Sequence, residues 1–227
     1  MTPVRAPAAR SEQGANGTGP GPVAGSLLAR CTFPPAGTAV TCAVSGGADS
    51  LALLVLAVAA GSDVTAVHVD HGLRAESAAE ASVVEAAARL YGAGFRAERA
   101  SVAPGPNLEA RARAARQAVL PPDALTGHTA DDQAETVLLN VLRGAGLDGL
   151  GGMAAGRHPI LGLRRHETSA VCRSEGLRPV QDPSNADPSF RRNRVRAEVL
   201  PLLADVAQRD VVPVLVRQAA LLRDEAE

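Results

Sequence analysis

The order of apolar and polar positions predicts short strands that alternate with helices. Runs rich in β-branched residues at 39–44 and 64–69 are each followed by a longer stretch suited to a helix, and so is a weaker run at 95–100, which begins with Phe95 and alternates with charges. A fourth apolar run at 124–126 precedes a helical pattern at about 130–143. Such alternation is typical of right-handed βαβ units, so we predict an α/β fold with a parallel sheet flanked by helices.

Changes in composition divide the chain into three segments. Residues 1–25 are rich in Ala, Gly, Pro and Thr and predict a disordered leader. Residues 26–155 carry the strand–helix alternation and form the predicted α/β domain. Residues 156–227 form a predicted Arg-rich, mainly helical extension, with nine arginines and four acids between residues 157 and 196. This positive charge suits either a nucleic-acid contact surface or a solvated helix face, and charge alone does not separate the two.

Composition excludes several kinds of site. The chain contains no lysine, since all 23 of its basic residues are arginine. That absence excludes a Walker-type Gly-Lys-Ser/Thr loop, a lysine Schiff base and a lysine general base. The net charge of −1 excludes polyanion binding through overall charge. Aromatic residues make up 2% of the chain, too few for the stacking platform of an RNA-recognition motif.

Cysteine usage and the length of the apolar runs bear on location. Cys31, Cys42 and Cys172 lie far apart and form neither a disulfide framework nor a CxxC site, which suits a reducing cytosol. Residues 1–25 show no apolar export signal, and the run at 51–60 is shorter than the roughly 20 residues that span a bilayer. We expect a soluble, cytoplasmic protein not bound to a membrane; its oligomeric state stays open, with a homodimer as one alternative.

The loop at residues 45–50 is the strongest candidate for ligand binding. Gly46 and Gly47 let the backbone approach a ligand closely, and the free N–H groups of the following helix favour a polyanion. Asp49 would repel bare phosphate, so we expect Mg²⁺ to bridge the two. The predicted ligand is a metal-complexed pyrophosphate group; the alternative is a tight turn that binds nothing. The binding residues would be Ser45, Gly46, Gly47, Ala48, Asp49 and Ser50.

Polar residues also follow the second and fourth predicted strands. Asp70 and His71 follow the second strand, and Gly127 and His128 follow the fourth. Ligands of parallel sheets bind beyond the carboxyl ends of the strands. We therefore expect these residues beside the loop at 45–50, which favours the ligand-binding interpretation of that loop.

The histidines near these strand ends allow two interpretations. His68, His71 and His128 could be zinc ligands, but no Cys or Glu completes the set at a recognisable spacing. Positioning of a nucleotide or substrate by His71 and Arg74 is the favoured alternative. His68 lies inside the second strand and is expected to be a hydrogen-bonded core residue.

Three acids open the helix that follows the fourth strand. Asp131 and Glu135 are four residues apart and Asp132 and Glu135 three apart, so their carboxylates can share one face. Acids in a first turn also stabilise the helix dipole, which is the alternative interpretation. Three acids at the ligand end of a parallel sheet exceed that need, so we favour metal binding or deprotonation of an amine.

The motifs together resemble a known family. The Ser-Gly-Gly-Ala-Asp-Ser loop resembles the SGGxDS signature of PP-loop (N-type) ATP pyrophosphatases. Four further blocks, in order along about residues 39–203, resemble the tRNA(Ile)-lysidine synthetases of that superfamily. The blocks are His68–Arg74; Gly127-His128 with Ala130–Thr136; Arg143-Gly144 with Gly146-Leu147; and Asp182–Asn185 with Arg192–Arg194.

The resemblance implies a fold, a reaction and a set of partners. The fold is adenine-nucleotide alpha-hydrolase-like and Rossmann-related, and residues 26–155 become the expected ATP-binding domain. ATP with Mg²⁺ would adenylate the C2 carbonyl oxygen of the wobble cytidine in tRNA(Ile) with a CAU anticodon, releasing pyrophosphate. The ε-amine of L-lysine would then attack C2 and displace AMP, giving lysidine.

The same resemblance assigns roles to residues. The loop at 45–50 would hold the β,γ-phosphates, with Asp49 as the magnesium ligand, and His71, Arg74 and His128 would contact the nucleotide. Catalytic residues would be Asp49, Asp131, Asp132 and Glu135, the last three recognising the lysine ammonium or helping to deprotonate it. Candidate tRNA contacts are Arg111, Arg113, Arg143, Arg192 and Arg194.

Several departures and alternatives accompany the resemblance. Thr129 stands where a second histidine is frequent in the family, and Gln117 where an aromatic residue is expected. Family members commonly carry further C-terminal tRNA-binding domains, so the chain is expected to be a short form or a truncation. A tRNA thiolase is disfavoured by the lack of paired cysteines. A non-catalytic tRNA- or nucleotide-binding module would not need Asp49 and Asp131 together.

Overall fold

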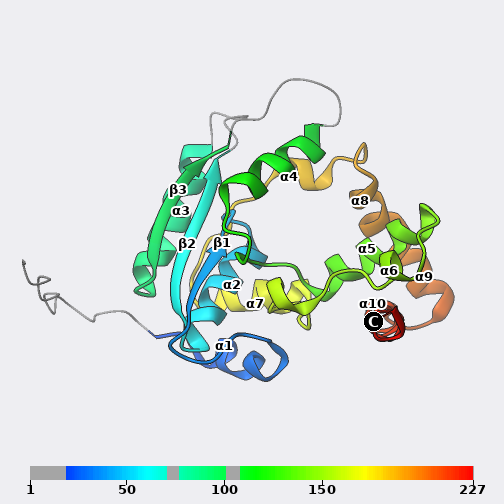
Figure 1. Ribbon diagram of the computed structural model, residues 1–227, viewed down its shortest axis with the longest axis horizontal. Helices are drawn as coiled ribbons and strands as arrows, with labels where there is room; N and C mark the ends of the chain where they lie inside the picture. The colour runs from blue at the N-terminus through cyan, green and yellow to red at the C-terminus, as the bar shows by residue number, and fades with distance from the viewer. Residues whose placement is uncertain (1–18, 71–76, 101–107, 227) are drawn as a thin grey trace, which may run out of the picture.

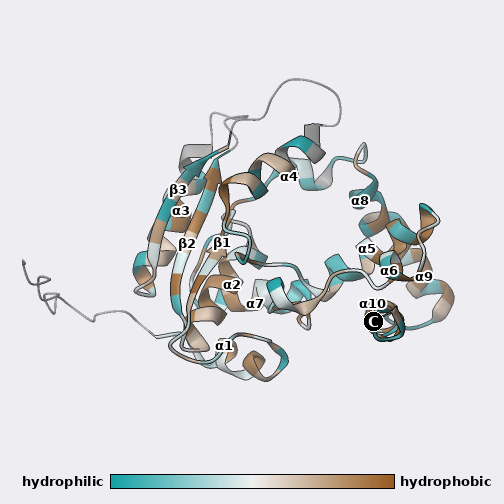
Figure 2. Ribbon diagram, in the orientation of Figure 1, coloured by the Kyte–Doolittle hydropathy of each residue, from teal (hydrophilic) through white to brown (hydrophobic). Residues whose placement is uncertain are grey.

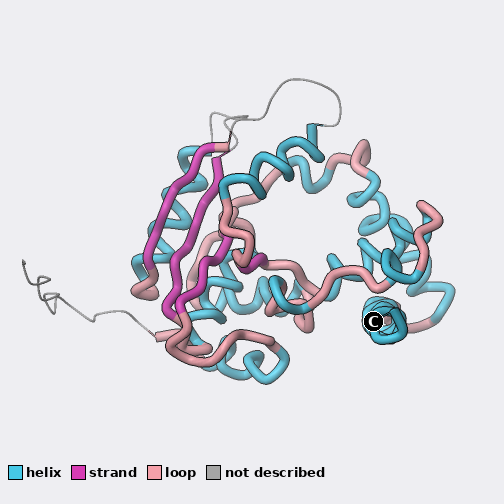
Figure 3. Tube along the Cα trace, viewed as in Figure 1, coloured by secondary structure: helices cyan, strands magenta, loops and turns pink. Residues whose placement is uncertain are grey.

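The computed structural model describes residues 19–70, 77–100 and 108–226. Its centre is a four-stranded parallel sheet in the order β3-β2-β1-β4 (Figures 1 and 3). The strands are β1 (Ala39–Ala43), β2 (Asp63–Asp70), β3 (Gly94–Arg99) and β4 (Leu125–Thr126). The predicted parallel α/β fold is therefore confirmed.

Strand register brings three strand ends to one edge of the sheet. Ala43, the last residue of β1, pairs with Val67 of β2 and with Thr126 of β4. The loops that follow β1, β2 and β4 therefore leave the sheet at the same edge, which is where ligands of parallel sheets bind.

Helices cover both faces of this sheet. α2 (Ala48–Ala59) and α3 (Ser77–Leu90) contribute to the main apolar core on one face. On the other face, Val67 of β2 packs with Leu120, which follows α4 (Leu108–Val119). The layers follow from strand alternation, because successive side chains of β2 point to opposite faces.

α2 is buried all round because a second helix covers the side that faces away from the sheet. Residues 51–57 are all buried, and the helix is apolar from residue 51 to its end (Figure 2). α7 (Arg165–Ser174) packs against it and adds Val171 and Cys172 to the main core, together with Ile160 and Leu163 from the preceding segment. Residues beyond the expected boundary at 155 thus share the core of the sheet domain; that boundary stays a prediction.

The N-terminal helix begins inside the predicted leader. α1 (Pro22–Leu27), continued by the 3₁₀ turn η1 (Leu28–Arg30), starts with a proline at a position where its missing N–H costs nothing. Ala24 is fully buried in the main core. The rest of the leader prediction, at residues 1–18, falls outside the described residues.

A second group of helices lies at the right of Figure 1. It consists of α5 (Ala130–Leu142), α6 (Leu147–Leu150), α8 (Arg191–Arg194), α9 (Leu200–Ala207) and α10 (Val212–Ala226). α10 packs against α5 and α6, and Ala130, Ala134 and Val212 are buried there. This group confirms the predicted helical C-terminal part. Within the described residues, no helix is both long and apolar enough to cross a membrane. The short helical turns of this part of the chain are η2 (Ala155–Arg157), which lies beside β4, η3 (Pro183–Ala186), and the π-helical η4 (Val195–Val199), which joins α8 to α9.

Candidate active site

A cavity of about 820 Å³ lies at the carboxyl edge of the sheet. Its walls come from the ends of β1, β2 and β4, from the loop at 45–50, from α7, and from residues 177–182. The volume falls in the range of about 300–1,000 Å³ that is usual for small-molecule sites. The loop that the sequence singled out therefore lines a cavity rather than a closed turn.

The loop at 45–50 owes its shape to one glycine and one serine. Gly46 has a φ of +91°, and a Cβ there would lie 3.1 Å from Cγ2 of Val180. The Val180 N–H donates to the Gly46 carbonyl oxygen at 2.9 Å. The Ser50 hydroxyl donates to the Gly47 carbonyl at 2.9 Å and accepts from the Ser45 N–H at 3.1 Å.

Gly47 is extended rather than left-handed and caps α2. The first-turn amides of α2 have no intrahelical acceptor, and their residues Ala48, Asp49 and Ser50 line the cavity. This arrangement favours an anion at the start of the helix.

Gly127 brings the loop after β4 onto the loop at 45–50. A Cβ at residue 127 would lie 2.7 Å from the Asp49 carbonyl oxygen and 3.0 Å from the Ser50 Cα, which no side chain tolerates. The two sequence motifs are therefore in backbone contact, and His128 lines the same cavity.

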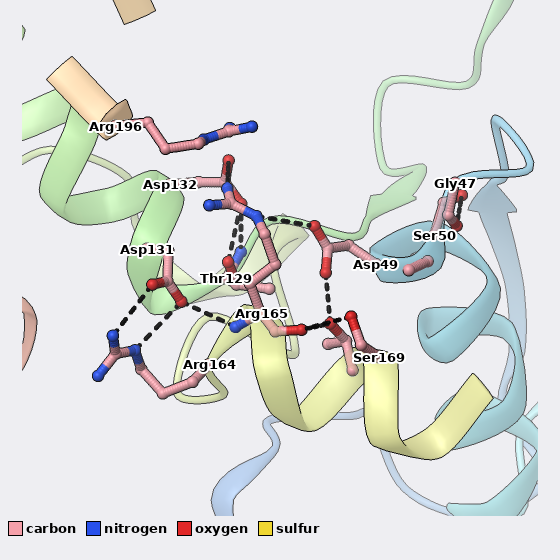
Figure 4. Close-up of polar contacts among 12 residues, drawn as sticks. Gly47, Asp49, Ser50, Thr129, Asp131, Asp132, Arg164, Arg165, Ser169 and Arg196 are labelled. Atoms are coloured by element: carbon pink, nitrogen blue, oxygen red, sulfur yellow. Dashed lines mark hydrogen bonds and ion pairs between the residues drawn. The ribbon is translucent and has the colours of Figure 1, made fainter. Parts of the chain in front are cut away.

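Asp49 points from α2 toward α7 (Figure 4). Its Oδ1 accepts a hydrogen bond from the Thr168 hydroxyl, and its Oδ2 lies 3.5 Å from Nε of Arg165. Burial raises the pKa of Asp49 above its ordinary value, against the effect of the Thr168 and Arg165 contacts. A carboxylate beside helix-start amides offers the hard oxygen donor that Mg²⁺ prefers, so these residues fit a magnesium–phosphate group.

Asp132 combines a capping role with exposure to the cavity. Its Oδ2 accepts hydrogen bonds from the backbone N–H and the hydroxyl of Thr129, both at 2.9 Å, and its Oδ1 lies 3.0 Å from Nη2 of Arg165. Burial opposes ionisation, but Arg165, the Thr129 N–H and Arg192 outweigh it and hold the pKa of Asp132 below its ordinary value.

Glu135 is fully buried and meets three arginines. Its carboxylate lies 3.3 Å from Nη1 of Arg165, 2.7 Å from Nε of Arg192 and 2.7 Å from Nε of Arg196. Such a charge is tolerated in the interior only because it is paired and hydrogen-bonded. Asp132 and Glu135 thus share Arg165 and Arg192.

Asp131 turns to a different partner. Nε and Nη2 of Arg164 each donate to its carboxylate at 3.1 Å, and the Arg165 N–H donates at 2.8 Å. Arg164 also pairs with Asp210. Burial raises the pKa of Asp131, but the contacts with Arg164 and Arg165 more than offset this and lower it. In this arrangement Asp131 joins α5 to the start of α7.

His128 is neutral near pH 7. Its Nδ1 lies 2.8 Å from the Thr126 hydroxyl and 3.1 Å from Nδ1 of His158, whose ring it meets edge to face. Burial is the main cause that lowers the pKa of His128 to about 4. The described residues contain no group of three or more His, Cys, Asp or Glu able to hold a metal ion, which leaves the zinc alternative without support there.

His68 is a core residue as expected, but only one of its two ring nitrogens has a hydrogen-bond partner among the described residues. It is 2% exposed and its Nδ1 donates to the Val44 carbonyl oxygen at 3.0 Å, because a carbonyl can only accept. Its Nε2 is buried with no hydrogen-bond partner in the described part of the chain, and the ring lines the cavity. His71 and Arg74 lie outside the described residues.

Comparison with known proteins places this geometry in a family. The protein-family model described as the PP-loop domain matches residues 26–203 of the sequence. The chain belongs to the PP-loop family. It is 46% identical over 204 residues to a tRNA(Ile)-lysidine synthase of Nocardia farcinica, covering 85% of this chain and 64% of that protein. It is 46% identical over 202 residues to the enzyme of the same name from Rhodococcus erythropolis, covering 83% and 61%.

The chain spans less than two thirds of the length of these curated relatives. Among solved structures, the U34-tRNA thiolase NcsA from Methanococcus maripaludis superposes with a TM-score of 0.70 over 90% of this chain and 78% of that chain. The sequence identity is 17%, so this likeness supports the PP-loop fold alone.

The arginines assigned to tRNA lie in different settings around the PP-loop site. Arg192 turns inward to Glu135 and Asp132, Arg194 is exposed and pairs with Glu198, and Arg143 is exposed at the end of α5. Arg111 lies on α4, and the side chain of Arg113 is not among those described.

Sequence reasoning missed the two residues that contact the Asp49 carboxylate and two arginines that line the cavity. Arg116 of α4 and Arg173 of α7 line the cavity, and Arg165 and Thr168 contact Asp49. The available signal was the positive charge between residues 157 and 196, which contains Arg165 and Arg173 but does not say which arginines face the PP-loop.

Proposed function

We propose that this chain carries the ATP-dependent ligase activity of a tRNA(Ile)-lysidine synthase. L-Lysine would be joined to C2 of the wobble cytidine in tRNA(Ile) with a CAU anticodon, through an adenylated cytidine, giving lysidine, AMP and pyrophosphate. The observation that supports this most is the contact chain Asp49–Arg165–Asp132, which links the PP-loop to the acids of α5 in one cavity. The relatives named above support the same reaction.

The PP-loop supplies the proposed nucleotide site. The amides at the start of α2 would bind the β,γ-phosphates of ATP, and Asp49 would hold Mg²⁺. When bound, the metal would offset negative charge on the departing pyrophosphate. Arg116 and Arg173 line the cavity and would add positive charge to the phosphate site.

Asp132 is the proposed partner of the substrate ammonium. It lines the cavity, and its lowered pKa keeps it ionised, which suits recognition of a cation better than proton abstraction. Asp131 and Glu135, which the sequence assigned to the same task, are engaged with arginines; we propose that they act by holding Arg164, Arg165, Arg192 and Arg196 in place.

The cysteines disfavour a thiolase. Burial raises the pKa of Cys31 and Cys172 to about 11 and that of Cys42 to about 12, so each thiol is protonated near pH 7. Thiol and persulfide chemistry requires the thiolate. The proposed setting is the cytoplasm, with Arg111, Arg113, Arg143 and Arg194 as candidate tRNA contacts and a homodimer as one alternative for the assembly.

A pyrophosphate-release assay tests this proposal. The full chain is incubated with Mg²⁺-ATP, a tRNA(Ile) transcript with a CAU anticodon, and L-lysine, each component being omitted in turn. We expect release of pyrophosphate with that transcript, and formation of lysidine only when lysine is present. A transcript with uridine at the wobble position is the control. Lysidine absent from the complete reaction, or equal release with the uridine transcript, would reject the ligase.

A further inference from the structure

Two residues of one helix hold both carboxylate oxygens of Asp49. Thr168 and Arg165 lie one turn apart on α7, and Figure 4 shows Arg165 beside Asp49. The Thr168 hydroxyl donates to Oδ1, and Nε of Arg165 lies 3.5 Å from Oδ2. Thr168 is fully buried, while 28% of the Arg165 side chain is exposed.

These contacts fix the direction of the Asp49 carboxylate. The Thr168 hydroxyl on Oδ1 and the Arg165 guanidinium beside Oδ2 both come from α7, and hydrogen bonds to charged groups are the stronger kind. The direction in which Asp49 meets the cavity therefore depends on α7.

Arg165 also extends beyond Asp49. Its Nη2 lies 3.0 Å from Asp132 and its Nη1 lies 3.3 Å from Glu135. Those two acids have a second cation in Arg192, and Glu135 has a third in Arg196. Among the described residues, Asp49 receives its side-chain hydrogen bond and its ion pair from α7 alone. It is thus the acid that would respond most to changes in this helix.

We propose that Thr168 and Arg165 are positioning residues for the PP-loop. They hold the Asp49 carboxylate in its direction at the cavity, so that Mg²⁺-dependent nucleotide binding depends on two residues of α7. The inference rests on the proposed function for the nucleotide site. The nucleotide site would then include a helix that lies outside the SGGxDS motif, since Thr168 is 119 residues from Asp49 in the sequence.

Thr168 is the cleaner of the two to test. Replacing Arg165 would also remove a partner of Asp132 and Glu135, whereas Thr168→Val keeps the side-chain shape and removes one hydroxyl. Thr168→Ser restores the hydroxyl. Ser174→Ala is the matched control, because Ser174 lies on the same helix, does not line the cavity, and directs its hydroxyl to the Val171 carbonyl oxygen at 2.9 Å.

Calorimetry with a non-hydrolysable ATP analogue measures the effect without turnover. In each full-length variant the analogue is titrated once with Mg²⁺ and once with EDTA. Mg²⁺ should increase the affinity of the wild type for the analogue. We expect Thr168→Val to reduce this increase roughly tenfold, the size expected for the loss of a hydrogen bond to a charged group, and to leave the affinity in EDTA almost unchanged. Thr168→Ser and Ser174→Ala should match the wild type, and thermal unfolding shows whether each variant is folded.

A double-mutant cycle with Asp49→Asn distinguishes positioning from a structural role. If Thr168 acts through Asp49, then Thr168→Val adds no further loss in the Asn background. The inference is overturned if Mg²⁺ increases the affinity for the analogue equally in Thr168→Val and in the wild type. It is also overturned if Thr168→Val lowers the affinity as much in the Asp49→Asn background as in the wild type. A wild-type chain that binds no nucleotide with Mg²⁺ would overturn the proposed function as well, so the two failures are distinguishable.

Discussion

Gly127 lies so close to Asp49 that residue 127 cannot carry a side chain: a Cβ there would be 2.7 Å from the Asp49 carbonyl oxygen. The contact joins the loop after β4 to the first turn of α2, two segments that strand register already brings to one edge of the sheet. The shape of the PP-loop site therefore depends on backbone packing between its two motifs, in addition to the side chains that face the cavity.

Gly127→Ala should destabilise the protein by about 1–3 kcal/mol, since the added methyl group forces one backbone away from the other. It should also weaken nucleotide binding. Urea unfolding of the variant checks the first effect. Gly156→Ala is the control because nothing lies within 4 Å of its added Cβ. Equal stability of the two variants would contradict the close contact.

Gly46→Ala should impair the PP-loop through its backbone. The residue has a φ of +91°, a conformation that costs an L-residue about 1–2 kcal/mol, and the new Cβ would press on Val180 at 3.1 Å. Gly37→Ala is a matched control with a φ of +82°, open space around its Cβ, and a position before β1 at the opposite end of the strand.

Both of these variants should lower the free energy of unfolding through the strained φ, and Gly46→Ala should lower it more because of the contact with Val180. Only Gly46→Ala should lose affinity for an ATP analogue with Mg²⁺, measured by calorimetry. Unaltered affinity in Gly46→Ala would show that the loop conformation does not matter for the ligand.

Glu135→Gln should be among the most destabilising single changes in the chain. It removes the negative charge that three buried or half-buried arginines share, and breaking a buried ion pair costs about 3–5 kcal/mol. Glu198→Gln removes a carboxylate from an exposed pair with Arg194 and should leave the unfolding midpoint near the wild-type value. Denaturant midpoints of the two variants test the contrast; similar losses would contradict it.

Acid should weaken the contribution of Asp131 to stability. Its pKa in the folded protein lies below the ordinary value of 3.8, so its stabilisation is complete above that value and is lost as the pH falls through the lower folded value. The difference in unfolding free energy between wild type and Asp131→Asn should therefore be constant above about pH 5 and shrink below about pH 3.8. Asp148→Asn, at an exposed position, provides the comparison. A difference that grows toward acid would contradict the pKa shift.

Much of the fold and part of the site could be predicted from sequence. Strand–helix alternation predicted the parallel sheet. The rule that ligands bind at strand ends predicted that the loop at 45–50 and Gly127-His128 lie together, and both line one cavity. These are local patterns combined with a general rule of topology, which is why they transfer well.

Partner choice could not be predicted in this way. Helical spacing correctly predicted that Asp132 and Glu135 lie on one face of the helix, within reach of shared partners. It did not predict that Asp131 faces Arg164, or that Glu135 is buried among other arginines. Those pairings depend on how α5, α7 and α8 pack, across 30 or more residues of sequence. The same holds for Thr168, whose contact with Asp49 no spacing rule indicates.

The most direct test of the central claim is a crystal structure of the full chain with Mg²⁺ and a non-hydrolysable ATP analogue. The account predicts the β,γ-phosphates against the amides at the start of α2, with the metal between a phosphate oxygen and the Asp49 carboxylate. A nucleotide bound away from residues 45–50, or phosphates that leave Asp49 without the metal, would contradict it.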